Sequence, residues 1–285
     1  MKVLVIGGAG FVGSNLCEEL LKNHTVFSLD NYSSGSEDNH LEGVTYIKGH
    51  SKNISKLIDF EVDIVYHLGE YSRVEQSFDD IEKVVDSNVL GTISVIEFWR
   101  KKKFKLVYAG SSTKFSMGSL GKNQSPYAFS KSSNTELVCN YGSWFDLPYA
   151  ITYFYNVYGR REIEQGRYAT LIAIFKRKYL NGESLTVVEP GHQKRNFTYI
   201  DDVVSALILI GARGEGDEFG IACDESFSVL EIASMFGGKV KMLPARKGNR
   251  IDGEVVSEKT KNLGWNAKTN IIDHIIQYKK NNPRS

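Results

Sequence analysis

A tyrosine and a lysine four residues apart, Tyr127 and Lys131 in the segment SPYAFSK, form a pattern that can do acid–base chemistry. On a helix, residues at this spacing lie one turn apart on the same face. A free tyrosine has a pKa near 10, so a tyrosine base near neutrality needs a shift of about 3 units, or roughly 4 kcal/mol. One ammonium group at about 4 Å supplies roughly that much at an effective dielectric constant of about 20. The pair is common by itself, so its meaning depends on the elements around it.

A glycine-rich turn near the start of the chain is the strongest of those elements. In KVLVIGGAGFVGSNL, Gly8, Gly10 and Gly13 fit G-x-G-x-x-G, between an apolar run and an amphipathic stretch that begins at Phe11. Glycines let such a turn tighten and let a pyrophosphate approach the backbone, while the following helix offers unpaired N–H groups to the phosphates. The pattern predicts a dinucleotide site rather than an ordinary strand–turn–helix.

An acidic residue follows at the expected distance. Asp30 ends the second apolar run, in FSLDNYSSG, where a carboxylate can hold a ribose 2′-hydroxyl. The same carboxylate would repel a 2′-phosphate, and no arginine follows it at once. NAD is therefore favoured over NADP.

Short apolar runs alternate with amphipathic stretches over the first 155 residues. This alternation predicts an α/β fold of the Rossmann type, a doubly wound parallel sheet with helices on both faces. After residue 157 the pattern loosens, which predicts a smaller C-terminal α/β part. We expect an NAD-binding domain over residues 1–156 and a second domain over residues 157–285, with interleaved contacts. The apolar runs are KVLVI, TVFSL, VTYIK, DIVYHL, FKLVYAG and YAITYF, and the amphipathic stretches include 11–23, 81–100 and 126–144.

The bulk composition sets limits on function. The 285 residues carry a formal net charge of +1, so no global field favours nucleic acid or an anionic membrane. The basic segment WRKKKFK fits a solvated helix end better than a nucleic-acid patch. Three scattered cysteines form neither a disulfide framework nor a metal motif, so we expect a cytoplasmic protein without a metal site. No apolar run approaches the roughly 18 residues of a membrane-spanning helix.

Taken together, these segments resemble a known family, the extended short-chain dehydrogenase/reductases, and within it the NAD-dependent nucleotide-sugar epimerases and dehydratases. The resemblance extends over nearly the whole chain, and it implies that residues 157–285 form a nucleotide-sugar-binding domain. Its landmarks are GGAGFVG, DNYSSG, DIVYHLG, NVLGT, AGSST, SPYAFSK, NVYG and RNFTYIDD.

The resemblance implies roles for individual residues. Tyr127 would be the acid/base, Lys131 would tune it and hold the nicotinamide ribose, and Ser112 would hydrogen-bond the reacting sugar hydroxyl. Asn156, Arg195 and Arg246 would hold the substrate diphosphate, which suits guanidinium forks. The implied cofactor contacts are Gly7, Gly10, Phe11, Val12, Gly13, Asp30, Asn31, Ser51, Leu68, Gly69, Asn88, Tyr127 and Lys131.

The resemblance also implies a reaction, oxidation or reduction at the 4-position of a nucleotide-diphosphate sugar, with UDP or GDP as the expected nucleotide. A 4-epimerase with a transient 4-keto intermediate is favoured. The alternatives are a 4-dehydrogenase or 4-keto reductase, and a non-catalytic NAD-binding regulator. Dehydration is disfavoured because Thr113 and Lys114 stand where dehydratases carry a carboxylate.

The sequence also predicts the surroundings of His67 and Glu70 in the segment HLGE, and the oligomeric state of the protein. His67 fits a packed, hydrogen-bonded histidine better than an acid or a ligand. Glu70 stands where the family has a small residue, and it is either an extra polar contact near the cofactor or exposed. A homodimer is implied, with helices near 88–100 and 126–144 forming a four-helix bundle, although their apolar positions also fit an ordinary core.

Overall fold

A parallel sheet of seven strands is the centre of the protein. The computed structural model describes residues 1–115, 121–245 and 255–283. The strand order is β11-β6-β5-β4-β1-β2-β3, and every pairing in this sheet is parallel. The predicted Rossmann-type fold is confirmed. The strands are β1 (Lys2–Ile6), β2 (Thr25–Asp30), β3 (Thr45–Lys48), β4 (Ile64–His67), β5 (Lys105–Ala109), β6 (Tyr149–Phe154) and β11 (Gly216–Ile221).

The apolar runs form strands because both faces of the sheet are covered. Val3, Leu4 and Val5 of β1 have no exposed surface. Leu4 packs into the core on one face, whereas Val3 and Val5 pack into the core on the other. This alternation follows from the two-residue period of a strand, and it explains why the run is apolar throughout rather than at every second position.

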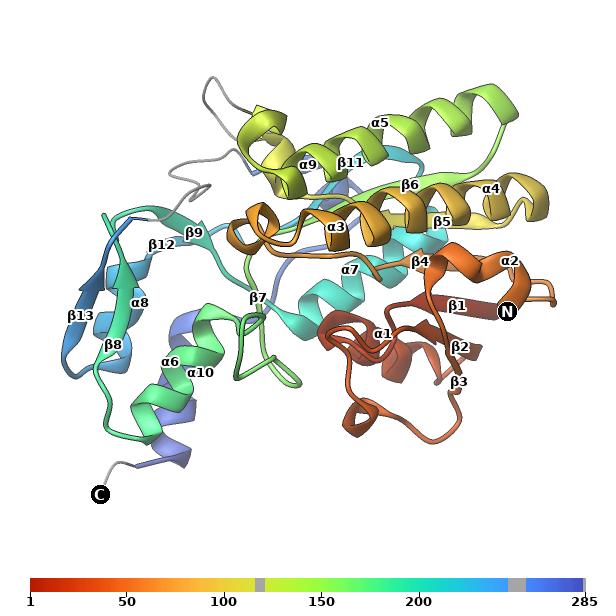
Figure 1. The fold of residues 1–285 in the computed structure, drawn as a ribbon. Coiled ribbons are helices and arrows are strands. Elements are labelled where there is room, and N and C mark those ends of the chain that lie inside the picture. Colours follow the sequence, from red (N-terminus) through yellow and green to blue (C-terminus); the bar gives the residue numbers. More distant parts are fainter. Residues whose placement is uncertain (116–120, 246–254, 284–285) are drawn as a thin grey trace.

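Helices cover the two faces as separate layers (Figure 1). Helices α4 and α5 lie side by side over one face, and α1 and α7 lie over the other. The first layer contains α2 (Ile54–Leu57), α3 (Ile81–Val84), the π-helical segment η4 (Val85–Gly91), α4 (Thr92–Lys102) and α5 (Pro126–Phe145). The second contains α1 (Phe11–Leu20) and α7 (Ile200–Arg213).

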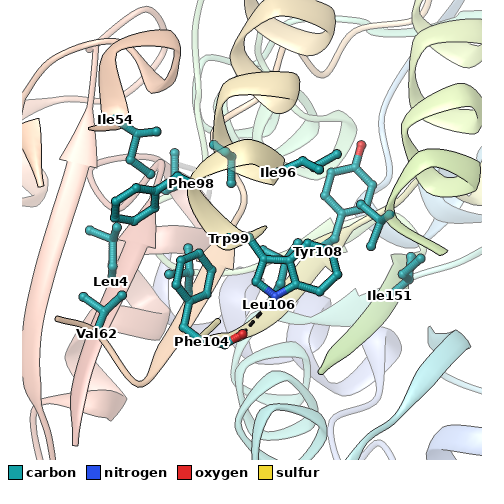
Figure 2. Close-up of a cluster of buried hydrophobic side chains, with 14 of the residues drawn as sticks. Leu4, Ile54, Val62, Ile96, Phe98, Trp99, Phe104, Leu106, Tyr108 and Ile151 are labelled. Carbon is teal, nitrogen blue, oxygen red and sulfur yellow. Dashed lines mark hydrogen bonds between the residues drawn. The ribbon is translucent and has the colours of Figure 1, made fainter. Parts of the chain in front are cut away.

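The core under α4 is centred on Trp99, which is fully buried (Figure 2). Its ring packs with Phe98, Phe104 and Leu106, and its indole N–H donates to the carbonyl of Phe104 at 2.9 Å. The hydrogen bond satisfies the one polar atom of a large buried ring. This packing fixes the C-terminal half of α4 against the sheet, next to the start of β5.

The C-terminal part has its own core of Tyr158, Phe175, Phe236 and their neighbours. It returns to the sheet twice, through α7 and through β11, so the two parts of the chain are interleaved in space. Its elements are β7 (Val157–Tyr158), α6 (Leu171–Leu180), β8 (Leu185–Val188), β9 (Lys194–Asn196), β10 (Thr198–Tyr199), β12 (Ser226–Ser228), α8 (Val229–Phe236), β13 (Val240–Leu243), α9 (Glu258–Asn262) and α10 (Ile271–Asn281).

Short 3-10 helices complete the connections. They are η1 (Glu37–Asn39), η2 (Ser51–Asn53), η3 (Glu75–Phe78), η5 (Ser112–Phe115) and η6 (Gly121–Gln124). Over the residues that the structure describes, no helix combines the length and apolar character that crossing a bilayer requires.

Candidate active site

The glycine turn lies between β1 and α1 at the carboxyl edge of the sheet. Gly7 has a φ of +86°, and a Cβ on Gly13 would come within 2.0 Å of the Gly7 carbonyl oxygen. Side chains at these two positions would therefore strain or push apart the turn. Helix α1 follows at Phe11, and its N-cap Gly10 contributes no side-chain cap. The first N–H groups of the helix thus face a surface that a diphosphate can approach.

Asp30, at the end of β2, holds this turn in place. Its Oδ2 accepts the backbone N–H of Ala9 at 2.9 Å, and its Oδ1 accepts that of Tyr32 at 2.8 Å. Burial raises the pKa of the Asp30 carboxyl, although both hydrogen bonds oppose this rise. A carboxylate held beside a glycine cradle at the point where the strand order reverses fits an adenosine ribose and pyrophosphate. The residues present therefore fit NAD.

One cavity of about 550 Å³ runs from this turn to Tyr127. It brings together residues that are far apart in the chain, from the ends of five strands and from the start of α5. Of the residues predicted from the sequence, its lining contains Gly7, Gly10, Phe11, Val12, Gly13, Asp30, Asn31, Leu68, Gly69, Ser112, Tyr127, Lys131 and Asn156.

Other predicted residues lie elsewhere. Ser51 and Asn88 are buried and do not line this cavity. The Asn88 side chain accepts from the N–H of Tyr71 at 2.7 Å and donates to the Tyr71 carbonyl and to Ser130 Oγ. It therefore ties the segment after β4 to α5, and a direct contact of Asn88 with the cofactor stays a prediction.

Of the three residues predicted to hold the diphosphate, the structure describes Asn156 and Arg195. Arg195, on β9, is outside the cavity lining, and its Nη1 donates to the carbonyl of Lys194 at 2.9 Å. Arg246 lies outside the described residues. Asn156 lines the cavity with a φ of +40°, and its amide donates to the Asn196 carbonyl at 3.1 Å.

Tyr127 and Lys131 are positioned by the first turn of α5. Ser125 is the N-cap, its side chain accepts the N–H of Ala128 at 3.0 Å, and Pro126 takes the first helical position. Both features favour helix initiation at this point. Tyr127 and Lys131 therefore share one helical face, and both line the cavity.

Lys131 is only 4% exposed, and its ammonium donates to the carboxylate of Glu70 and to the carbonyl of Ala109. The Glu70 side chain is 3% exposed, so of the two roles considered for it, the exposed one does not hold. Burial disfavours its charge, but Lys131 and the surrounding donors outweigh that effect and lower the pKa of Glu70. The sequence showed only that Glu70 replaces a small residue and gave no sign of its partner.

His67 is completely buried, and its Nε2 lies 3.0 Å from Thr92 Oγ1. Burial lowers the pKa of His67 to about 4. It is a packed, hydrogen-bonded histidine, as its sequence context predicted.

Two cations beside the cavity have partners that the sequence did not reveal. Lys114 donates to Asp217 on β11 at 2.5 Å and to Tyr153 OH at 3.2 Å, so it does not point freely into solvent. Arg73, in the cavity lining after β4, donates to the carbonyl of Tyr168, and its Nε has no hydrogen-bond partner among the described residues. Sequence reasoning missed Arg73 because nothing local distinguishes it from a surface arginine.

A family model described as the NAD dependent epimerase/dehydratase family matches residues 3–222. The chain belongs to this family. The resemblance seen in the sequence is confirmed, and so is the prediction of NAD as the cofactor.

Individual relatives are similar over most of their length. A UDP-glucose 4-epimerase of Mycolicibacterium smegmatis is 28% identical, with 97% of each chain covered. A UDP-N-acetyl-alpha-D-glucosaminuronate decarboxylase of Bacillus cytotoxicus is 30% identical, over 81% of this chain and 78% of the relative. Among solved structures, the UDP-glucose 4-epimerase of Thermus thermophilus in complex with NAD has a TM-score of 0.87 and 25% identity, with 96% of each chain covered.

Proposed function

We propose that this protein is a nucleotide-sugar 4-epimerase that works through a transient 4-keto sugar. The observation that carries the proposal is the single cavity of about 550 Å³, which joins the glycine turn and Asp30 to Ser112, Tyr127 and Lys131. Full-length similarity to proteins named UDP-glucose 4-epimerase supports the same reaction and favours a UDP-sugar as substrate.

The side chains divide the work of the first step. Ser112 holds the 4-hydroxyl, and Tyr127 takes its proton as the C4–H bond breaks and the C4–O bond becomes a carbonyl. When bound, NAD supplies the two-electron acceptor and donor for this chemistry. Tyr127 then returns the proton when the ketone is reduced from its other face. Asn156, at the C-terminal side of the cavity, is proposed to orient the diphosphate.

Dehydration fits this site less well. Lys114 occupies the position of a dehydratase carboxylate, and it is bonded to Asp217 and Tyr153. The neighbouring Thr113 hydroxyl donates to Ser111 Oγ at 2.9 Å. Neither side chain can remove a proton from the sugar carbon next to the ketone.

Replacement of Tyr127 tests the proposal. Tyr127→Phe is expected to keep NAD and to lose at least about a hundredfold in turnover, because it lacks the acid/base group. The assay incubates the protein with UDP-, GDP- and dTDP-sugars and follows the products by NMR. Tyr141→Phe is the matched control, since Tyr141 lies on the same helix and donates to Glu97 at 2.9 Å. Near wild-type turnover by Tyr127→Phe would refute the role of Tyr127.

We also propose a homodimer through the layer that contains α3, η4, α4 and α5. Large apolar side chains are exposed on this layer, including Ile81, Leu90 and Ile93 near α4 and Phe129 on α5, with 43% to 55% of their surface exposed. Leu90→Glu is expected to convert the dimer to a monomer, because a charge there would be desolvated in the interface. Light scattering during gel filtration measures this, and an unchanged molar mass would contradict it.

A further inference from the structure

Glu70 is the centre of a buried network that the proposed reaction does not use. Its Oε1 accepts from Thr92 Oγ1 at 2.6 Å, from Asn134 Nδ2 at 2.9 Å and from Tyr108 OH at 3.1 Å. Its Oε2 accepts from Lys131. Four elements therefore converge on one carboxylate: the segment after β4, α4, β5 and α5.

Every contact of this carboxylate comes from a donor. Because Thr92 donates its only hydroxyl proton to Glu70, it must accept from the Nε2–H of His67. The hydrogen bonds thus run from His67 through Thr92 to Glu70 in one direction. Such a set stabilises the ionised carboxylate and leaves no acceptor for a carboxyl proton.

The consequence for Lys131 is electrostatic. The ammonium and the carboxylate are 5% and 3% exposed, so they form a buried pair with no net charge. A second Lys131 donor is used by the Ala109 carbonyl. A neutral pair stabilises a nearby phenolate far less than a free ammonium would, because the two charges act on it with opposite sign.

Besides Lys131, the described cavity lining contains two cations, Arg73 and Arg167. Arg167 is paired with Asp80 at 3.4 Å, whereas Arg73, within the described part of the chain, donates to backbone carbonyls rather than to a carboxylate. It lines the same cavity as Tyr127, is stacked 5.7 Å from the ring centroid of Tyr168, and interacts electrostatically with Tyr127. Among the described residues, the titratable and charged groups in this cavity and around Lys131 and Arg73 include His67, Glu70, Tyr71 and Arg73 on and after β4, Tyr108 on β5, and Arg167 and Tyr168 before α6.

We propose that Glu70 is a positioning residue that holds Lys131 in a neutral pair, so that Arg73 supplies the net positive charge beside Tyr127. The proposal deepens the proposed function and rests on it for the role of Tyr127. It assigns Lys131 mainly to placement, and it makes Arg73 the electrostatic partner of the phenol.

A double-mutant cycle on the NAD-loaded protein tests this without turnover. The variants are Glu70→Gln, Lys131→Met and the two combined, and the readout is the pH midpoint of tyrosinate absorbance. The Tyr127 signal is isolated by subtracting the same titration made in a Tyr127→Phe background. Glu82→Gln is the control, because it removes one exposed carboxylate from α3.

The expected midpoint falls by about one pH unit in Glu70→Gln and rises by about one unit in Lys131→Met, since each variant leaves one uncompensated charge. The combined variant is expected to titrate within a few tenths of a unit of wild type. Arg73→Gln is expected to raise the midpoint by about one unit. Glu82→Gln is expected to leave it unchanged.

A rise of about one unit in the combined variant would overturn the proposal, because Lys131 would then act as a free cation. An unchanged midpoint in Arg73→Gln would overturn the role of Arg73. If Glu70→Gln does not fold, the pH midpoint of the combined variant alone tests the proposal. The combined variant is expected to fold because it leaves neither the Glu70 nor the Lys131 charge buried without a partner. Absence of turnover on every nucleotide sugar would refute the proposed function, while the titration would still report on Glu70.

Discussion

His67 should make the protein sensitive to mild acid. It is fully buried, its Nε2 bonds with Thr92, and its Nδ1 has no partner among the described residues. A proton added to Nδ1 would therefore place a cation in the core without an acceptor. Burial is the main reason that the pKa of His67 falls from 6.5 to about 4.

The sign and size of the effect follow from linkage. Below its ordinary pKa, the unfolded histidine binds a proton that the folded one does not, so stability is lost as the pH falls from about 6.5 towards 4. The free energy of unfolding is therefore expected to be about 2 kcal/mol lower at about pH 5 than at about pH 8 because of His67. Such a loss is a substantial part of the stability of an ordinary domain.

Urea unfolding of wild type and of His67→Gln, at about pH 8 and about pH 5, measures this term. The glutamine keeps an N–H near Thr92 but does not titrate. The free energy of unfolding of wild type is expected to fall by about 2 kcal/mol more than that of the variant between the two pH values. Equal losses in the two proteins would show that His67 does not resist protonation.

Two further changes test the cofactor site and the core. Asp30→Asn is expected to weaken NAD binding by about tenfold and to reduce the preference for NAD over NADP, because it removes the charge that binds ribose hydroxyls and repels a 2′-phosphate. Calorimetric titration with NAD and with NADP measures both affinities. An unchanged ratio of the two affinities would contradict this prediction. Trp99→Ala is expected to lower the free energy of unfolding by about 3–5 kcal/mol, since it empties a fully buried site and leaves the Phe104 carbonyl without its donor. Urea unfolding measures this loss. A loss below about 1 kcal/mol would contradict the packing in Figure 2.

Features encoded within one or two neighbouring elements could be predicted from the sequence. The glycine turn, Asp30 and the Tyr127–Lys131 spacing each follow from local rules of strand, turn and helix. The strands of the sheet also follow, because runs such as KVLVI are apolar on both faces. The stretch 81–100 was predicted as amphipathic, and the structure divides it into α3, the π-helical segment η4 and α4.

Features that depend on distant partners could not be predicted. The Glu70 carboxylate can be buried because four donors surround it, and only the tertiary fold brings these donors together. They are Thr92, Tyr108, Lys131 and Asn134. Asn88 belongs to the NVLGT segment, and its side-chain amide forms hydrogen bonds with Tyr71 and Ser130. A motif identifies the residue type at a position, whereas the surrounding hydrogen bonds decide which way the side chain faces.

The most direct test of the account follows the hydrogen on C4 of the sugar. The protein is incubated with UDP-glucose that carries deuterium at C4, and the products are examined by NMR and mass spectrometry. The account predicts UDP-galactose that retains the deuterium at C4, because the hydride leaves and returns within one site. Solvent hydrogen at C4, or inversion at a different carbon, would contradict the central claim.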